Sequence, residues 1–282
     1  MRGEMIDIGG RRLHLIAEGP PSDEPTVLLE AGAFGFSADW GAVQQRLAAA
    51  GWRVLAYDRA GLGASDPGPE PRDGQAVIDD LDALLAAIGE RGPFIVVGHS
   101  MAGLYLRLFA GRHPDAVAGL VLVDATTPEA TDSALGRAFV GRFIRAVGLS
   151  AGVARTGLYG PLSLTWFGEK IGLDAVAGAE KRRAFARPAH HRWAAAEVAT
   201  WFETAAQAMA SGPLDPRWPV AVITAGRRRG VSAAMAAPAH ASNHGYVETV
   251  QGSSHTTLLG ECYADAILRG VEHVHDAWTR DR

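Results

Sequence analysis

FIVVGHSMAG, residues 94–103, reads as an apolar strand that runs into a tight turn and a following helix. Gly98 and Ser100 match G-x-S-x-G, the turn that presents a nucleophilic serine in many hydrolases, but Ala102 stands where the pattern has its second glycine. Residue 102 falls in the first turn of the expected helix, where ordinary helical dihedrals suffice and only side-chain volume is limited. The turn is therefore expected to tolerate the extra methyl group.

Short apolar runs alternate with helical patterns on both sides of this stretch, which is typical of a parallel sheet covered by helices. The first two expected strands are joined around Gly9 and Gly10, a hairpin signal. Strands are expected at residues 4–8, 11–18, 26–30, 53–58, 94–98, 119–123, 220–224 and 246–250. The clearest helices span about residues 73–88 and the last part of the chain, and the sequence therefore predicts an α/β fold.

The strand pattern disappears between about residues 127 and 215, where the chain becomes helical and rich in alanine. Aromatic residues are scattered through this segment: Trp166, Phe167, Trp193, Trp201 and Phe202. Because strand signals resume after it, residues 127–215 are expected to form a helical cap inserted into a core made of residues 1–126 and 216–282.

Composition limits the classes of partner. The chain has 282 residues, 48% of them hydrophobic, and a net charge of −4 without a basic face, which argues against nucleic acid. No apolar run is long enough to span a membrane, because the richest stretch contains Arg107.

Cys262 is the one cysteine, and the charged N-terminal sequence has no apolar stretch typical of a signal peptide. A cytoplasmic location is expected, and the oligomeric state stays open.

A serine hydroxyl needs a histidine to accept its proton and a carboxylate to orient that histidine. In a parallel sheet, residues just past the carboxyl ends of the strands converge on one edge. His255 lies in QGSSH, five residues past the last residue of the expected strand YVETV, and is therefore the expected base. His99 is expected to point away from the serine. His99 is expected to be structural or exposed, and so are five other histidines: His113, His190, His191, His240 and His244. None of them is expected to form a metal site.

The carboxylate has several candidates. The loop after the strand VAVIT contains no acid, and the two later acids, Glu248 and Glu261, fall in an expected strand and an expected helix. Asp124 follows the strand GLVLV directly, next to the strand that leads to the serine, and is the preferred candidate. Asp124 could instead cap the loop DATTPE, and Glu129 is then the second candidate for the carboxylate that orients the histidine.

An oxyanion hole needs two N–H groups that point at the charge developing on a carbonyl oxygen. One is expected from Met101, the residue after the serine. The other is expected from Ala33, in the glycine-spaced loop after the strand TVLLE. Both donors belong to the backbone, so their side chains are almost free to vary.

Four motifs occur in order along the chain: EAGAFG, YDRAGLGASD, GHSMAG and QGSSH. In this order and spacing the chain resembles the α/β-hydrolase superfamily, in its serine branch with a helical cap. The resemblance implies a mostly parallel eight-stranded sheet, a lid over the site, Ser100 as nucleophile and His255 as base. Some members of dehalogenase-like architecture carry their acid where Asp124 stands. The chain departs from the family's usual residues at Ala31 and Ala60.

The residues and the resemblance together favour a serine hydrolase that needs no cofactor or metal and acts on a small or medium-sized carboxylic ester or lactone. The expected partner is therefore a small ester-like molecule. Two alternatives remain open: a lyase or cyclase that uses the same pocket for proton transfer, and a catalytically silent ligand-binding protein. The serine at position 100 argues against the dehalogenase and epoxide hydrolase branches, which have an aspartate nucleophile there.

Overall fold

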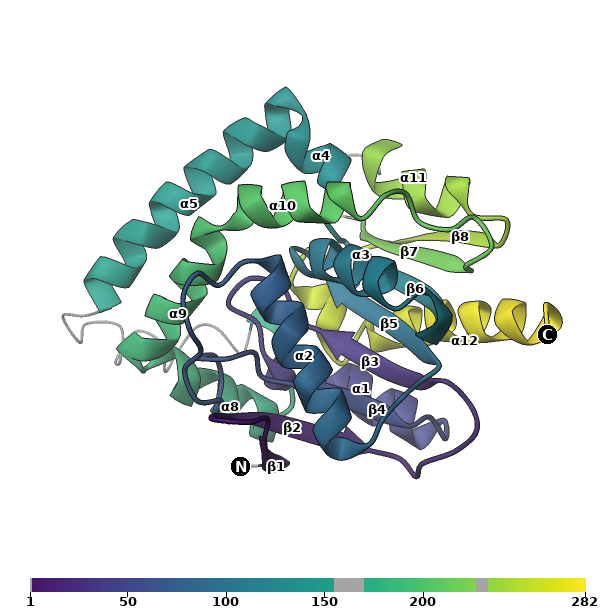
Figure 1. Cartoon of the computed structure of the whole chain (residues 1–282), viewed down its shortest axis with the longest axis horizontal. Helices are drawn as coiled ribbons and strands as arrows, with labels where there is room; N and C mark the ends of the chain where they lie inside the picture. Colours follow the sequence, from purple (N-terminus) through teal and green to yellow (C-terminus); the bar gives the residue numbers. More distant parts are fainter. Residues whose placement is uncertain (1, 155–169, 227–232) are drawn as a thin grey trace.

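The structure is a computed structural model that describes residues 2–154, 170–226 and 233–282 (Figure 1). Its strands are β1 (Glu4–Asp7), β2 (Arg12–Glu18), β3 (Thr26–Glu30), β4 (Val54–Tyr57), β5 (Phe94–His99), β6 (Val117–Val123), β7 (Val220–Ala225) and β8 (Gly245–Val250). The helices of the core are α1 (Gly41–Ala49), α2 (Gly74–Ile88), α3 (Ala102–Arg112), α11 (Ala233–Ala241) and α12 (Ala264–Arg280). Short 3-10 turns are η1 (Ser37–Trp40), η2 (Pro114–Ala116) and η3 (Thr257–Leu259).

The eight strands form one sheet in the order β1-β2-β4-β3-β5-β6-β7-β8. Strand β2 pairs antiparallel with both β1 and β4, and every later pairing is parallel. Strands β3, β5, β6 and β7 are buried along their whole length, as expected for strands covered on both faces. This arrangement confirms the predicted α/β fold with a mostly parallel eight-stranded sheet.

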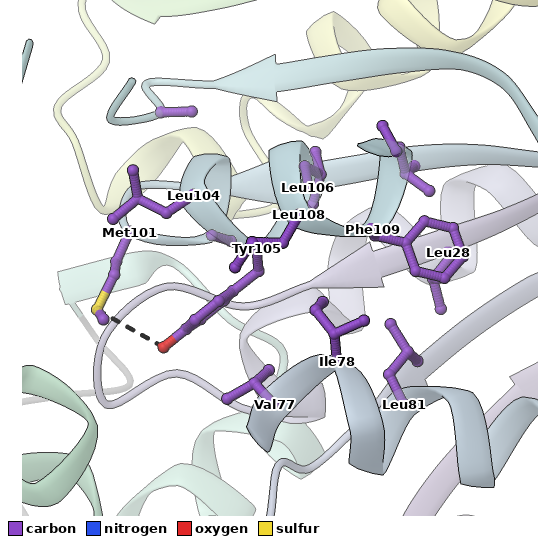
Figure 2. Packing of buried hydrophobic residues seen from close by; sticks show 14 of the residues in the cluster. Leu28, Val77, Ile78, Leu81, Met101, Leu104, Tyr105, Leu106, Leu108 and Phe109 are labelled. Carbon is purple, nitrogen blue, oxygen red and sulfur yellow. Dashed lines mark hydrogen bonds between the residues drawn. The ribbon is translucent and has the colours of Figure 1, made fainter. Parts of the chain in front are cut away.

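Helices cover both faces of the sheet, and their apolar residues recur at helical spacing. Helices α1 and α12 pack on one face, and α2 and α3 pack on the other (Figure 1). Figure 2 shows Val77, Ile78 and Leu81 of α2 next to the side chains of α3 and Leu28 of β3. This packing fixes α3, and with it the turn that precedes α3, against the sheet.

The described part of the chain between β6 and β7 contains five helices. They are α4 (Pro128–Asp132), α5 (Ala134–Ala154), α8 (Ala175–Phe185), α9 (Pro188–Ala199) and α10 (Trp201–Ala210). Helix α10 packs on α2 and α3, and α5 packs on α9 at the outside of the molecule (Figure 1). Trp166 and Phe167, two of the aromatic residues in the expected cap, lie outside the described residues.

Two local expectations were wrong. Helix α11 lies in a stretch read from the sequence as a loop, because the alanine-rich segment around Pro238 has no apolar periodicity to indicate a helix. Glu261 was expected in a helix but lies in the turn before α12. Within the described ranges, no helix combines the length and the apolar character needed to cross a membrane.

Candidate active site

The turn between β5 and α3 holds Ser100 in a left-handed backbone conformation, with φ 57°. A Cβ at position 98 would lie 2.7 Å from the Leu106 side chain, and a Cβ at position 103 would lie 2.4 Å from the carbonyl oxygen of Thr126. Ala102 is fully buried at the first position of α3 and is accommodated. Backbone therefore excludes a side chain at position 103, whereas a methyl group at position 98 would have to displace the end of the Leu106 side chain, and position 102 accepts alanine.

Ser100, His255 and Asp124 form one hydrogen-bonded chain. The Ser100 hydroxyl lies 3.0 Å from Nε2 of His255, and Nδ1 of His255 lies 2.5 Å from a carboxylate oxygen of Asp124. Because a carboxylate only accepts, Nδ1–H donates to Asp124 and Nε2 is left to accept from the serine. Groups bonded in this order can move the hydroxyl proton to the imidazole while the carboxylate stabilises the resulting cation.

The position of Asp124 follows from the sheet. It comes directly after β6, its N–H donates to the carbonyl of Ile223 in β7 at 2.7 Å, and its exposure is only 2%. The loop that follows is capped by another residue, because the Thr127 side chain accepts from the N–H of Ala130 at the start of α4. Glu129 lines the same cavity, but it is half exposed and lies 3.6 Å from Arg107. The structure thus brings Asp124, and not Glu129, to His255.

Ala33 and Met101, the expected oxyanion donors, lie on two loops beside the serine. Ala33 lines the cavity, whereas Met101 is fully buried at the start of α3. Among residues 2–154, 170–226 and 233–282, neither amide donates a hydrogen bond to a protein acceptor. The N-terminal end of α3 adds a partial positive charge at this point. Neither amide is thus committed to another acceptor within these residues, as an oxyanion donor requires.

Backbone strain concentrates at the same place. In the described chain, the non-glycine residues with positive φ are Phe34 at 61°, Ser100 at 57° and Asp124 at 43°. All three line the cavity, and such conformations persist where surrounding packing and hydrogen bonds enforce them. The strain therefore coincides with the proposed nucleophile, its orienting carboxylate and the loop of Ala33.

A cavity of about 990 Å³ opens in front of Ser100. Its wall is formed by residues of the sheet edge and by side chains from the helices between β6 and β7, among them Phe139, Phe143, Phe185 and Trp201. Of the other aromatic residues expected in this segment, Trp193 does not line the cavity but belongs to the same small apolar cluster as Phe185, and Phe202 is partly exposed. Most of the wall is apolar, so the cavity suits a ligand with a substantial hydrocarbon part.

His99, which was expected to be structural, contacts His255. Its ring lies 4.5 Å from the ring of His255, and its Nε2 lies 2.9 Å from the His255 carbonyl oxygen. Burial, together with the neighbouring His255, lowers the pKa of His99 to about 3. A neutral His99 therefore supports the backbone of the histidine that faces Ser100.

His190 and His191 lie on α9 and are both buried. His190 accepts from the N–H of Gly63, and His191 Nε2 donates to the carbonyl of Phe185. Burial lowers the pKa of both imidazoles. Among the described residues, no group of three or more His, Cys, Asp and Glu side chains is placed to hold a metal ion.

Sequence reasoning missed three buried ion pairs beside the loop of Ala33. Arg59 pairs with Glu30 and with Glu197 of α9, and Lys181 of α8 pairs with Asp39. Burial lowers the pKa of the Lys181 ammonium, and the neighbouring Asp39 carboxylate offsets part of this shift. Arg59 belongs to the quoted motif YDRAGLGASD, but Glu197 and Lys181 lie in helices whose sequence gives no sign of these partners.

Several proteins with curated names resemble part of this chain. Probable transporter efuK from Hormonema carpetanum is 38% identical over 130 residues, which are 44% of this chain and 18% of that protein. Bifunctional esterase/perhydrolase DCH from Acinetobacter calcoaceticus is 34% identical over 109 residues, 38% of this chain and 39% of that protein. Epoxide hydrolase B from Mycobacterium tuberculosis (strain ATCC 25618 / H37Rv) is 32% identical over 123 residues, 42% of this chain and 33% of that protein. The matched stretch spans less than half the length of each relative.

Solved structures match nearly the whole chain. Cfl2 from Burkholderia cenocepacia has a TM-score of 0.76 at 24% identity and covers 96% of this chain and 97% of its own. The enol-lactonase from Burkholderia xenovorans LB400 has a TM-score of 0.68 at 20% identity, with coverages of 96% and 99%. These likenesses show a shared fold, and the family model of the alpha/beta hydrolase fold matches residues 25–259. The sheet order, the turn at Ser100 and this match agree, and the chain belongs to the alpha/beta hydrolase family.

Proposed function

We propose that this protein is a serine hydrolase that cleaves a small or medium-sized carboxylic ester or lactone through an acyl-enzyme on Ser100. The observation that carries the proposal is the hydrogen-bonded chain from Ser100 through His255 to Asp124 at the wall of a largely apolar cavity. The protein's own side chains supply the nucleophile, the base and the orienting carboxylate, so the proposal includes no cofactor. The names esterase/perhydrolase and enol-lactonase among similar proteins support the choice of substrate class.

In the first half of the reaction, Nε2 of His255 takes the hydroxyl proton as Ser100 Oγ attacks the substrate carbonyl carbon. The carbonyl oxygen becomes an anion, and the N–H groups of Ala33 and Met101 stabilise it. The tetrahedral intermediate collapses as the C–O bond to the leaving group breaks, and His255 passes its proton to the departing oxygen. Asp124 keeps the ring oriented and stabilises its positive charge.

In the second half, water replaces the alcohol. His255 removes a proton from the water as its oxygen attacks the acyl carbon, and the same two N–H groups stabilise the second oxyanion. The bond to Ser100 Oγ then breaks, the serine takes the proton back from His255, and the carboxylic acid leaves. A lactone releases one hydroxy acid by the same steps, because its alcohol and acyl parts stay joined.

We also propose that residues 127–215 serve as the cap of a core made of residues 1–126 and 216–282. The cavity wall combines side chains of both parts, for example Phe139 and Trp201 with Leu259. Such a cap shields the acyl-enzyme from bulk water and selects the substrate by shape. The cytoplasmic location expected from the sequence stays a prediction.

A serine-reactive fluorophosphonate tests the proposal. The reagent is expected to phosphonylate Ser100 and to stop the hydrolysis of p-nitrophenyl butyrate in proportion to the label found by mass spectrometry. The Ser100→Ala variant is the control for other reactive sites. Ser133 provides an internal comparison, because it also lines the cavity but has a carbonyl as its partner in place of a histidine.

The outcomes separate the possible functions. Labelled Ser100 and hydrolysis of esters or lactones support the serine hydrolase. Proton-transfer activity that persists in Ser100→Ala would favour a lyase or cyclase in the same pocket. An unlabelled and inactive protein that still binds apolar ligands would favour a binding protein.

A further inference from the structure

The loop that carries Ala33 is held by a buried arginine. Nη1 of Arg59 donates to the carbonyl of Ala31 at 2.6 Å, and Nη2 donates to the carbonyl of Gly32 at 2.9 Å. The Gly32 carbonyl and the Ala33 N–H belong to the same planar peptide unit. A cation that binds the carbonyl end of this unit therefore fixes the direction of the N–H at its other end and polarises it as a donor.

Arg59 is itself fixed by two carboxylates. Glu197 accepts from Nε at 2.9 Å and from Nη2 at 2.8 Å, and Glu30 accepts from Nη1 at 2.6 Å. With the two loop carbonyls, these contacts use all five N–H groups of the guanidinium. The side chains of Arg59, Glu30 and Glu197 are each no more than 3% exposed, so water cannot replace a lost partner.

Glu197 comes from α9, whereas Arg59 and the Ala33 loop belong to the core (Figure 1). A second contact joins the same loop to a helix of the 127–215 segment. Lys181 of α8 lies 2.6 Å from Asp39, and its Nζ is 3.5 Å from the Phe34 carbonyl. Two helices of this segment thus hold the loop from outside the sheet.

We infer that Glu197, acting through Arg59, is a positioning residue that sets the direction of the Ala33 N–H in the oxyanion hole. This inference rests on the proposed acyl transfer and extends it, because it assigns part of the oxyanion hole to a helix between β6 and β7. Glu197 does not line the cavity, so it is not expected to contact the substrate directly. Its loss is expected to weaken stabilisation of the transition state and to leave ground-state binding almost unchanged.

The test compares two identical substitutions in buried or half-buried ion pairs. Glu197→Gln keeps the side-chain length but removes the charge that faces Arg59. Glu180→Gln is the matched control, because Glu180 lies on α8, pairs with Arg2 and does not line the cavity. Each variant is measured for kcat and KM on p-nitrophenyl butyrate and for inhibition by a trifluoromethyl ketone, whose adduct with Ser100 carries an oxyanion.

E197Q is expected to lower kcat about 10- to 100-fold, somewhat less than the loss of a whole oxyanion donor, with KM changed by less than about twofold. The inhibition constant of the ketone is expected to rise by a similar factor. E180Q is expected to leave all three values unchanged. Glu197→Asp keeps the charge but shortens the reach to Arg59, so it is expected to lower kcat and ketone affinity by a smaller factor than E197Q with KM unchanged. That smaller, parallel loss is the test if E197Q does not fold.

The results distinguish this inference from the proposed function. An active wild type whose E197Q and E197D variants keep kcat and ketone affinity would overturn the inference alone. A rise in KM without a fall in kcat would also overturn it, because that pattern indicates substrate binding. A wild type that neither hydrolyses esters nor reacts at Ser100 would overturn both.

Discussion

Single residues around Ser100 divide into those fixed by backbone space and those fixed by chemistry. Gly98 and Gly103 leave room where β5, α3 and the loop after β6 meet, while Ala102 only fills the first turn of α3. Ser100 and Asp124 are fixed by the roles that the proposed reaction gives their side chains, and both have a backbone with positive φ. Substitutions at the two kinds of position are therefore expected to fail in different ways.

Gly103→Ala and Ala102→Gly test the space around the turn. A Cβ at 103 would meet the Thr126 carbonyl and displace the loop that carries Asp124, so Gly103→Ala is expected to cost about 2–3 kcal/mol of unfolding free energy and most of the activity. Ala102→Gly, which restores the common motif, is expected to cost about 1 kcal/mol through helix propensity and to keep activity. Urea unfolding and ester hydrolysis measure both. A stable, active Gly103→Ala would contradict the packing argument.

Asp124→Asn tests the carboxylate. The amide cannot hold the imidazole in the tautomer that accepts from Ser100, so kcat is expected to fall by about 10⁴-fold while the fold is kept. Glu129→Gln and Asp23→Asn are the controls, the first because Glu129 lines the cavity and the second because Asp23 is exposed. Near-normal turnover in Asp124→Asn with a large loss in Glu129→Gln would transfer the role to Glu129.

At the level of elements, helix α2, together with α3, links the sheet to α10. Its apolar face packs on α3 and the sheet, and its N-cap Asp73 accepts from the N–H of Ala76 at 3.0 Å. The second oxygen of the same carboxylate accepts from Gln207 of α10 at 3.0 Å. One side chain therefore caps α2 and joins it to a helix of the 127–215 segment.

Asp73→Ala tests this double role. The loss of the cap and of the bond to Gln207 is expected to lower the free energy of unfolding by about 1–2 kcal/mol, with kcat per folded molecule unchanged because Asp73 lies outside the cavity wall. Thermal and urea unfolding measure the change, with Asp23→Ala as an exposed control. An Asp73→Ala protein as stable as the control would show that the cap contributes nothing here.

At the level of the whole molecule, buried histidines couple stability to pH. An unfolded histidine binds its proton below about pH 6.5, whereas the pKa of His99 in the folded protein is about 3. Between these values the unfolded state binds more protons, so the free energy of unfolding decreases as the pH falls from about 6.5 towards 3. His190 and His191 shift in the same direction.

His99→Gln tests this linkage, because glutamine stays neutral and can still donate to the His255 carbonyl. The wild type is expected to lose about 4 kcal/mol to the titration of His99 between pH 7 and 3, and the variant is expected to show a correspondingly flatter dependence. Urea unfolding at a series of pH values measures it, with the exposed His240→Gln as control. Parallel curves for wild type and His99→Gln would contradict the assignment.

The sequence by itself determined the strands, the sheet class and two residues of the candidate site, Ser100 and His255, and it made Asp124 the preferred third. Buried parallel strands are continuous apolar runs, so TVLLE at 26–30 is strand β3 to the residue. The position of Ser100, Asp124 and His255 just past strand ends was also enough to predict that they converge, because parallel strands end at one edge. Helix α11 escaped prediction, since its alanines give no periodic apolar face.

Only the tertiary structure decided which side chains meet across long separations. It placed Asp124 and not Glu129 beside His255, turned His99 toward His255, and joined Arg59 to Glu197, 138 residues away. A charged residue on a helix reads as a solvent-facing one until the packing of that helix is known. Burial is a property of the assembled fold, and here it converts ordinary charges of α8 and α9 into contacts that hold the loop of Ala33.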